Sequence, residues 1–372
     1  MLPVSRPSIG QEELKEVEKI FASGWLGLGS AVFEFENKLK EYLGAKHVMA
    51  VNTGTTALHI ALDAFGIKEG DEVVVPSLTF CASIQVITAL GARPVFCEIN
   101  PENLNMDICD VRKKITRKTK AIMPVHYCGQ ACDMDALLEI SRNQNIFIIE
   151  DAAHAFGSSY KGEKIGSFGN ATCFSFDPIK NLTCGEGGAI VLSDDTFAEI
   201  IRTKRILGID KDTWHRYRNE RTWFYEVTMQ GYRYHMSNIN AAIGIAQLEK
   251  LTAFIQRKKE IVKKYNDVFV NIAGIKILSW NLKETAPFTY IVRVLNGSRE
   301  KLIEFLKKKG VCTGIHYIPN HLQPFFKPFA TTLPVTEQIG EEILTLPLYY
   351  DMTDEQVSTV INAVRNFFTV NN

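Results

Sequence analysis

The sequence predicts an α/β fold in which a mostly parallel sheet carries helices on both faces, followed by a smaller α+β domain. Three observations support this prediction. Short apolar runs alternate with helical patterns up to about residue 207, as in βαβ units. Most of these runs are apolar throughout, which is typical of strands buried on both faces. The chain has 372 residues, a length that suits two domains.

The predicted elements follow one another in a regular order. Two helices come first, at 10–22 and 31–44, and the second ends at Gly44. Strands are then predicted at 47–51, 72–75, 94–99, 121–125, 146–150 and 188–193. Further helices are predicted at 55–65, 81–90, 134–144 and from 194 to about 207. Ligands of such sheets bind beyond the carboxyl ends of the strands, so the turns there are the places to search.

The character of the chain changes after residue 207. The stretch 208–237 is rich in Arg, Trp and Tyr and has no clear period. A long helical pattern follows that is apolar early and charged late, as expected of a helix that leaves one core for another. We place the domain boundary within it, near Lys250. The predicted domains are 1–249 and 250–372, the second with a strand at 290–295 and helices at 299–310 and 354–368.

The composition argues against several classes of protein. The 42 Lys and Arg residues balance 42 Asp and Glu residues, which disfavours a nucleic-acid binder. No apolar stretch is long enough for a membrane span, and the start does not resemble a signal peptide. The eight cysteines are scattered, and the isolated CxxxC pair Cys128 and Cys132 favours reduced thiols over a metal site. We expect a cytoplasmic protein with no nucleic acid partner and no metal.

Two stretches after predicted strands place small or acidic residues where a ligand would bind. In "NTGTTALH" (52–59), residues 53–56 begin a helix, whose free N–H groups and dipole attract an anion. The alternative is a helix cap with nothing bound. In "IFIIEDAAHAFG" (146–157), Asp151 ends a buried strand and is either a cap or the partner of a buried cation. His154 lies close by and, taken alone, reads as a core histidine. No GxGxxG or GxxxxGK[ST] motif is present.

Two further stretches supply an aromatic ring and an amine. Phe80 in "SLTF" (77–80) is either a core residue or a ring that stacks on a flat ligand. Lys180 in "CFSFDPIKNLTCGEGG" (173–188) lies between Ser175 and a glycine cluster. Burial lowers the pKa of a lysine and makes it nucleophilic, although a lone lysine is a weak signal. An anion site, a carboxylate, a ring and an amine together are what pyridoxal 5′-phosphate requires.

Motifs along nearly the whole chain resemble the fold type I, aspartate-aminotransferase-like family of sugar aminotransferases named for DegT, DnrJ, EryC1 and StrS. They are "RPSIGQEE", "SGWLGLG", "NTGTTALH", "GDEVVVPSLTF", "PVHYCGQACDMDAL", "IIEDAAHAFG", "GSFGNATCFSFDPIKNLTCGEGG", "NINAAIGIAQLEKL" and "GIHYIPNHLQPFF". The resemblance implies an enzyme that aminates a nucleotide-linked keto sugar, with L-glutamate as the donor, for surface glycans such as lipopolysaccharide O-antigen. Within the family the chain is most similar to enzymes that act on the C4 ketone of UDP-sugars, and we expect a 6-deoxy sugar.

The resemblance also implies roles for individual residues. Lys180 carries the cofactor and moves protons, Asp151 faces the pyridine nitrogen, and His154 lies near the phenolic side. Phe80 stacks on the ring, and Gly54, Thr55 and Ser175 hold the phosphate. His316, Tyr317 and Asn320 reach the sugar nucleotide. The family forms homodimers with shared sites, and Arg233 and His235 occupy the positions at which relatives place an asparagine that touches the partner's phosphate.

Three alternatives remain open. The first is a C3-keto-sugar aminotransferase of the same family. The second is a sugar dehydratase, and the third is a regulatory protein that binds the cofactor or a sugar nucleotide without turnover. The dehydratases of the family replace the lysine by histidine, so Lys180 counts against the second alternative. The complete set of residues disfavours the third.

Overall fold

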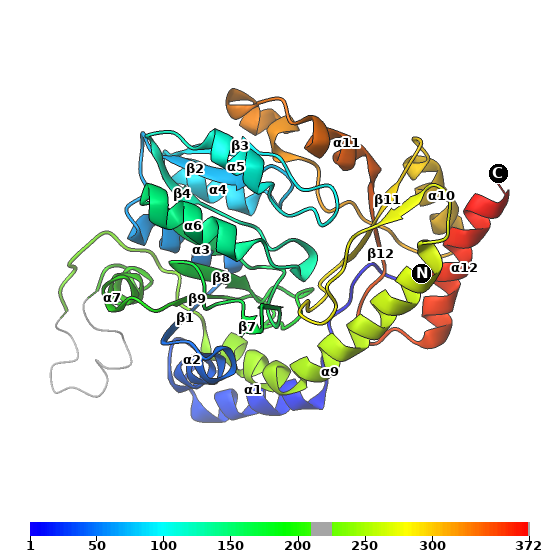
Figure 1. The fold of residues 1–372 in the computed structure, drawn as a ribbon. Helices are drawn as coiled ribbons and strands as arrows, with labels where there is room; N and C mark the ends of the chain where they lie inside the picture. Colours follow the sequence, from blue (N-terminus) through cyan, green and yellow to red (C-terminus); the bar gives the residue numbers. More distant parts are fainter. Residues whose placement is uncertain (210–224, 371–372) are drawn as a thin grey trace.

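A seven-stranded sheet forms the centre of the computed structural model, which describes residues 1–209 and 225–370 (Figure 1). In spatial order its strands are β1 (His47–Val51), β9 (Gly188–Leu192), β8 (Ala171–Ser175), β5 (Phe147–Asp151), β4 (Thr119–Ile122), β2 (Glu72–Pro76) and β3 (Arg93–Cys97). Only β9 runs against its neighbours among these strands, since β1 and β8 both pair with it antiparallel and the other pairs are parallel. The mostly parallel sheet is therefore confirmed.

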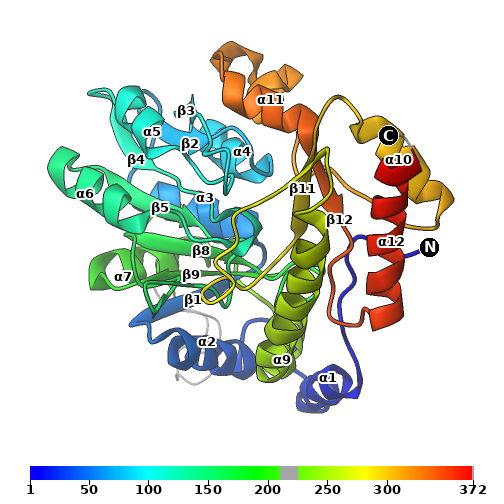
Figure 2. The ribbon, with the colours of Figure 1, turned by 45° about the vertical axis from the view of Figure 1, so that its right-hand side comes forward.

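Helices cover both faces of this sheet (Figures 1 and 2). One face packs against α3 (Gly54–Ala64), α4 (Ala82–Ala89) and α7 (Asp195–Lys204). The other packs against α2 (Ser30–Leu43), α5 (Ile108–Lys114), α6 (Met134–Gln144) and the start of α9 (Asn238–Phe269). Alternate residues of β1 divide between the two cores: Met49 and Val51 face α3, and Val48 and Ala50 face α2. Two-sided burial explains why the strand sequences are apolar at almost every position.

One strand at the centre of the sheet was missing from the sequence prediction. β8 carries polar side chains that break the apolar pattern, yet Thr172 and Ser175 are both buried. The Thr172 hydroxyl donates to Glu150 Oε1 on β5 at 2.6 Å, which satisfies it in the core. The sequence prediction also missed the short helices at Ile108–Lys114 (α5) and Pro334–Glu342, the strands at Ile275–Ile277 and Ile343–Leu346, and the hairpin at 159–164. The elements that were predicted differ from the structure only at their ends.

The C-terminal part contains a second, antiparallel sheet of β10 (Ile275–Ile277), β11 (Tyr290–Val294) and β12 (Ile343–Leu346). It packs with α10 (Arg299–Lys308), α12 (Asp354–Val370) and the later half of α9, as Figure 2 shows. The remaining elements are α1 (Gln11–Ser23), α11 (Pro334–Glu342), the hairpin of β6 (Ser159–Tyr160) and β7 (Glu163–Lys164), and 3₁₀ turns at Tyr127–Gly129, Asn320–Leu322 and Pro324–Phe329. No helix in the described ranges is both long and apolar enough to cross a membrane.

The helix α9 connects the two parts. Ala241 to Leu251 pack in the core with α2, and Ile261 to Phe269 pack in the core with β11. The predicted boundary at 249/250 lies just before Leu251, the last of the first group, and it stays a prediction. The extreme N-terminus contacts the C-terminal part, since the Leu2 N–H donates to the Gly310 carbonyl at 2.7 Å.

The direction of the strands decides where the functional residues lie. Six strands run the same way, so their carboxyl ends meet at one edge of the sheet. The turn from β8 to β9, residues 176–187, returns at this same edge because Ser175 pairs with Gly188. Lys180 therefore lies above the ends of β1, β2 and β5, which are far away in the sequence.

Candidate active site

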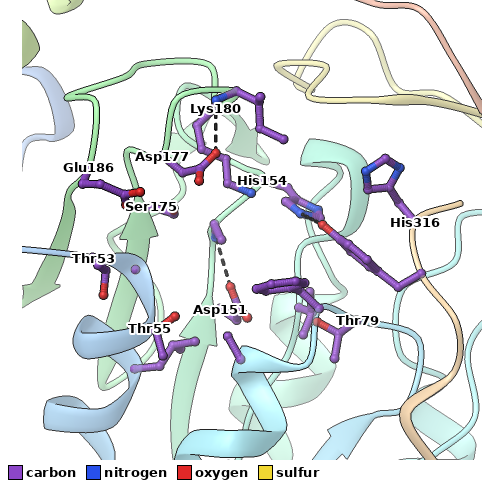
Figure 3. Close-up of a pocket in the computed structure, with 18 residues that line it drawn as sticks. Thr53, Thr55, Thr79, Asp151, His154, Ser175, Asp177, Lys180, Glu186 and His316 are labelled. Carbon is purple, nitrogen blue, oxygen red and sulfur yellow. Dashed lines mark hydrogen bonds between the residues drawn. The ribbon is translucent and has the colours of Figure 1, made fainter. Parts of the chain in front are cut away.

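A cavity of about 300 Å³ opens at this edge of the sheet (Figure 3). The predicted residues that line it are Gly54, Thr55, Phe80, Asp151, His154, Ser175, Lys180, His316 and Tyr317. They come from the ends of four strands of the large sheet, β1, β2, β5 and β8, and from the segment that follows α10. The structure thus brings together residues that lie as much as 263 positions apart in the sequence, from Gly54 to Tyr317.

The N-terminus of α3 forms one wall of the cavity. Thr53 caps the helix, and its Oγ1 accepts from the Thr56 N–H at 3.0 Å. The N–H groups of Gly54 and Thr55, in the first turn, have no acceptor within the helix. A Cβ atom on Gly54 would lie 2.7 Å from Ser175 Cβ, so only glycine lets this helix begin so close to β8. Two free N–H groups, a nearby hydroxyl and the helix dipole suit a phosphate group.

A second glycine permits the same close approach from the other side. A Cβ atom on Gly188, at the start of β9, would lie 2.4 Å from the Thr53 carbonyl oxygen. That distance is shorter than van der Waals contact, so a larger residue here would displace the first turn of α3. The glycine cluster after Lys180 is therefore part of the construction of the anion site.

Asp151 lies at the bottom of the cavity, at the carboxyl end of β5. Its side chain is 5% exposed. Oδ2 accepts from the Ser83 hydroxyl at 2.6 Å, and Oδ1 accepts from the Ala153 N–H at 3.1 Å. Burial raises the pKa of Asp151, while these two hydrogen bonds and the charge of Lys180 act in the opposite direction. A buried carboxylate in this setting favours a cationic partner, such as a protonated ring nitrogen.

Lys180 reaches into the cavity from the turn between β8 and β9. Its Nζ lies 4.3 Å from the ring centre of Phe288. Burial lowers the pKa of Lys180 to about 8, although the carboxylates of Asp177 and Asp151 act to raise it. A lysine with this pKa is neutral in about a tenth of the molecules at pH 7, far more than an ordinary lysine, which makes its amine available as a nucleophile and as a base.

His154 lies between two aromatic side chains. Its ring stacks on Phe288 with centres 4.3 Å apart, and its Nε2 lies 3.1 Å from the Tyr317 hydroxyl. Burial lowers the pKa of His154 well below its usual value and raises that of Tyr317, so both are neutral. Nδ1 of His154 is buried without a hydrogen-bond partner among the described residues. When Tyr317 donates to Nε2, Nδ1 carries the proton and is a donor ready for a ligand oxygen.

The rim of the cavity carries Phe80 and His316. The Phe80 ring is 54% exposed, which is unusual for a phenylalanine and leaves a flat apolar face open at the cavity. His316 Nδ1 lies 2.9 Å from the Thr345 hydroxyl. Burial and the charge of Lys180 lower the pKa of His316, so this side chain is a neutral hydrogen-bonding group.

Three predicted site residues lie outside the cavity lining. Asn320 is 2% exposed, and its Nδ2 donates to the carbonyls of Ser77 and Thr79 at 3.0 and 2.7 Å. These bonds hold the segment with His316 against the turn after β2. The backbone of Arg233 forms an antiparallel β-bridge with Ile206, and that of His235 forms one with Val51 at the end of β1. The predicted role of Arg233 and His235 lies in a partner's site, and residues 210–224 of the same stretch fall outside the described residues.

The structure adds residues that sequence reasoning did not assign to the site. Asp177 and Glu186 line the cavity, as Figure 3 shows. Both lie within the sequence motif around Lys180, so their closeness to Lys180 in the sequence could have identified them as site residues. Phe288 contacts both Lys180 and His154 but belongs to the segment before β11. Nothing in the local sequence indicates that contact. Within the described ranges, no group of three or more His, Cys, Asp or Glu side chains is arranged to hold a metal ion.

Comparison with known proteins agrees with this geometry. Residues 7–365 match the model of the family described as DegT/DnrJ/EryC1/StrS aminotransferases. The chain belongs to this family. It is 40% identical to the spore coat polysaccharide biosynthesis protein SpsC of Bacillus subtilis, over 98% of this chain and 96% of the relative. The family resemblance inferred from the motifs is confirmed.

Solved structures show the same fold. The aminotransferase TlmJ from Streptoalloteichus hindustanus superposes with a TM-score of 0.93 at 34% identity, with full coverage of both chains. The putative sugar aminotransferase Spr1654 from Streptococcus pneumoniae, in its PMP form, gives a TM-score of 0.94 at 30% identity, also with full coverage. The fold type I architecture and the prediction of an aminotransferase are thereby confirmed.

Aminotransferases of this family use pyridoxal 5′-phosphate, and Spr1654 was also solved in a PLP form. The cofactor prediction is confirmed. The residues at the cavity fit this group on their own chemistry. The α3 N-terminus suits its phosphate, the buried Asp151 suits its ring nitrogen, and the unpartnered Nδ1 of His154 suits a ring oxygen.

Proposed function

We propose that this enzyme transfers an amino group from L-glutamate to the C4 ketone of a nucleotide-linked 6-deoxy sugar, for the synthesis of a surface polysaccharide. One observation carries the proposal: a single cavity holds the Lys180 amine, the buried Asp151 and the open N-terminus of α3. The name of SpsC, a polysaccharide biosynthesis protein, supports the pathway. The sugar, its C4 position and the donor come from the resemblance of the motifs.

Different residues at the cavity would hold different parts of the cofactor. Gly54, Thr55 and Ser175 would hold its phosphate, Asp151 its ring nitrogen, and Phe80 one face of its ring. When bound, the cofactor supplies an electron sink that makes a C–H bond of the attached substrate acidic. Asp151 supports this chemistry because its buried negative charge favours the protonated ring nitrogen.

Lys180 moves the proton that the reaction requires. Nζ would act as the base of the site when it is not bonded to the cofactor, and burial lowers its pKa to about 8. In its neutral form Nζ accepts the proton from the carbon that bears the donor nitrogen. As an ammonium it would then act as the general acid that returns a proton. The ring of Phe288 beside Nζ keeps water away from this exchange.

The sugar half-reaction tests the proposal directly. The holoenzyme, first treated with ¹⁵N-labelled L-glutamate, is mixed with UDP-linked and dTDP-linked 4-keto-6-deoxy sugars. We expect ¹⁵N at C4 of a sugar and one 2-oxoglutarate per amino group. Nitrogen at C3 of a 3-keto sugar, with none from the 4-keto sugars, would favour the C3 alternative. A holoenzyme that binds these nucleotides but never transfers nitrogen would support the regulatory alternative.

His316 offers a variant that separates the two halves of this assay. Its side chain lies at the rim of the cavity, where the sugar nucleotide would enter, and not at the phosphate or ring nitrogen sites. We expect His316→Ala to weaken the sugar half-reaction about tenfold, as for the loss of one or two hydrogen bonds, and to leave the glutamate half-reaction near wild type. Equal losses in both halves, measured by single-turnover absorbance, would make His316 a structural residue.

We further propose that the enzyme is a homodimer with shared active sites, in which Arg233 or His235 reaches the partner's cofactor phosphate. Arg233 is exposed in the single chain, which supports a contact between its guanidinium and a second chain. Sedimentation at assay concentration is expected to give a dimer. A fully active monomer would contradict the shared site.

A further inference from the structure

A second lysine is buried behind the cavity. Lys258 belongs to α9 and is only 6% exposed. Its Nζ donates to Asn181 Oδ1 at 2.9 Å. Among the described residues no carboxylate forms an ion pair with it, in contrast to the buried Arg205, which pairs with Glu36. An unpaired buried ammonium is costly, so a lysine at this place calls for a reason other than packing.

The hydrogen bond from Lys258 to Asn181 leads to the segment that carries Lys180. Asn181 directly follows Lys180, and it is 5% exposed. Its Nδ2 donates to the Ala286 carbonyl at 3.1 Å. Two residues after Ala286 comes Phe288, whose ring lies against the Lys180 amine. Asn181 thus connects α9, the turn with Lys180 and the segment with Phe288.

We propose that Lys258 is a positioning residue for Lys180: through Asn181 it fixes the turn that carries this amine, and it places a second cationic side chain beside it. The inference rests on the proposed role of Lys180 in binding the cofactor. It also explains why α9 keeps a lysine among the apolar residues that it buries.

The charge on Lys258 favours the neutral form of Lys180. Burial, and to a smaller extent the charge of Lys180, lower the pKa of Lys258 to about 8. Because such coupling is reciprocal, a charged Lys258 disfavours the charge on Lys180 to the same extent. The other ionisable groups that face Lys180 are the carboxylates Asp151 and Asp177, which favour its charge, and the neutral imidazoles of His154 and His316. The charge of Lys258 therefore acts on the pKa of Lys180 in the direction opposite to that of the two carboxylates.

The test measures the proton on Lys180 without the transamination reaction. Full-length protein freed of cofactor is mixed with pyridoxal 5′-phosphate, and the rate of capture is followed by absorbance across the pH range. Capture requires the neutral amine, so its rate rises with pH around the pKa of Lys180. In Lys258→Met, which keeps the length and loses the charge, we expect this midpoint to rise by about one pH unit, and capture at neutral pH to slow about tenfold.

Two matched variants separate charge from shape. Lys258→Arg keeps a cation and is expected to return the midpoint to near the wild-type value. Lys259→Met changes the next lysine of the same helix, which is partly exposed and donates to the Lys283 carbonyl, and is expected to shift nothing. If Lys258→Met fails to fold, as judged by thermal unfolding, Lys258→Gln replaces it, because glutamine still donates to Asn181 without a charge.

The outcomes divide clearly. A wild-type midpoint in the neutral variant would overturn the proposal, and so would equal shifts in the Met and Arg variants, since shape alone would then be responsible. A wild-type protein that captures no cofactor at any pH would contradict the proposed function instead. A shift that the neutral variants share and Arg reverses would support the role of Lys258.

Discussion

Lys180→Ala is expected to lose turnover by more than about 10⁴-fold, because the variant lacks a proton carrier worth about 10²–10⁴-fold and the nucleophilic amine as well. The visible absorbance that the cofactor shows when attached to this lysine should disappear. The protein should still fold, because the folded state already disfavours the charge on Lys180: burial lowers its pKa to about 8. Steady-state assays, absorbance spectra and thermal unfolding check these three expectations.

Two control variants make the Lys180 result specific. Lys180→Arg keeps the charge and much of the length, but a guanidinium stays protonated, so this variant should be as inactive as Lys180→Ala. Lys161→Ala removes an exposed lysine paired with Asp135, away from the cavity, and should keep wild-type turnover. Turnover of Lys180→Ala within tenfold of wild type would remove Lys180 from the mechanism.

The site was predictable in large part because it is built on strand ends. Val51, Pro76, Asp151 and Ser175 each end a strand that runs in the same direction. The residues just beyond such ends must meet at one edge, whatever the length of chain between them. Local sequence alone was therefore enough to nominate Asp151, the start of α3 and Lys180, although each signal by itself was weak.

The contacts that were not predictable join segments across the two parts of the chain. Phe288 comes to Lys180 from the segment before β11, and Lys258 comes to Asn181 from the middle of α9. Periodicity assigns Lys258 to the charged half of a helix, where an exposed lysine is expected, yet it is buried. Only the packing of α9 against the turn after β8 decides this, and no local pattern records it.

The support for Asp151 also depends on tertiary packing. The neighbouring residue Glu150 points to the other face of β5, where Oε2 lies 2.8 Å from Nε2 of His126 and both side chains are fully buried. The His126 N–H in turn donates to the Asp151 carbonyl at 3.1 Å. Because His126 Nδ1 accepts from the Cys132 N–H, its proton lies on Nε2 and is donated to Glu150. This network fixes the end of β5 and hence the direction in which Asp151 points.

Asp151→Asn is expected to keep the shape of the side chain and to lower turnover by about 10²- to 10⁴-fold, since breaking a buried charge pair costs about 3–5 kcal/mol and each 1.36 kcal/mol is tenfold in rate. The physical reason is the loss of the negative charge that favours a protonated ring nitrogen. The amide can occupy the same position, and its Oδ1 can still accept from the Ala153 N–H. Single-turnover rates with L-glutamate, measured on enzyme saturated with cofactor, separate this effect from weaker cofactor binding.

Ser83→Ala is the matched control for Asp151. It removes the hydroxyl that donates to Asp151 Oδ2 at 2.6 Å and leaves the charge in place. Loss of one hydrogen bond to a charged group costs about 1.5–3 kcal/mol. The decrease in turnover caused by Ser83→Ala should therefore be clearly smaller than the decrease caused by Asp151→Asn. If the two variants lose the same amount, orientation and not charge is the contribution of Asp151. If Asp151→Asn turns over within a factor of about two of wild type, the carboxylate does not face the ring nitrogen, and the cofactor is bound in another way.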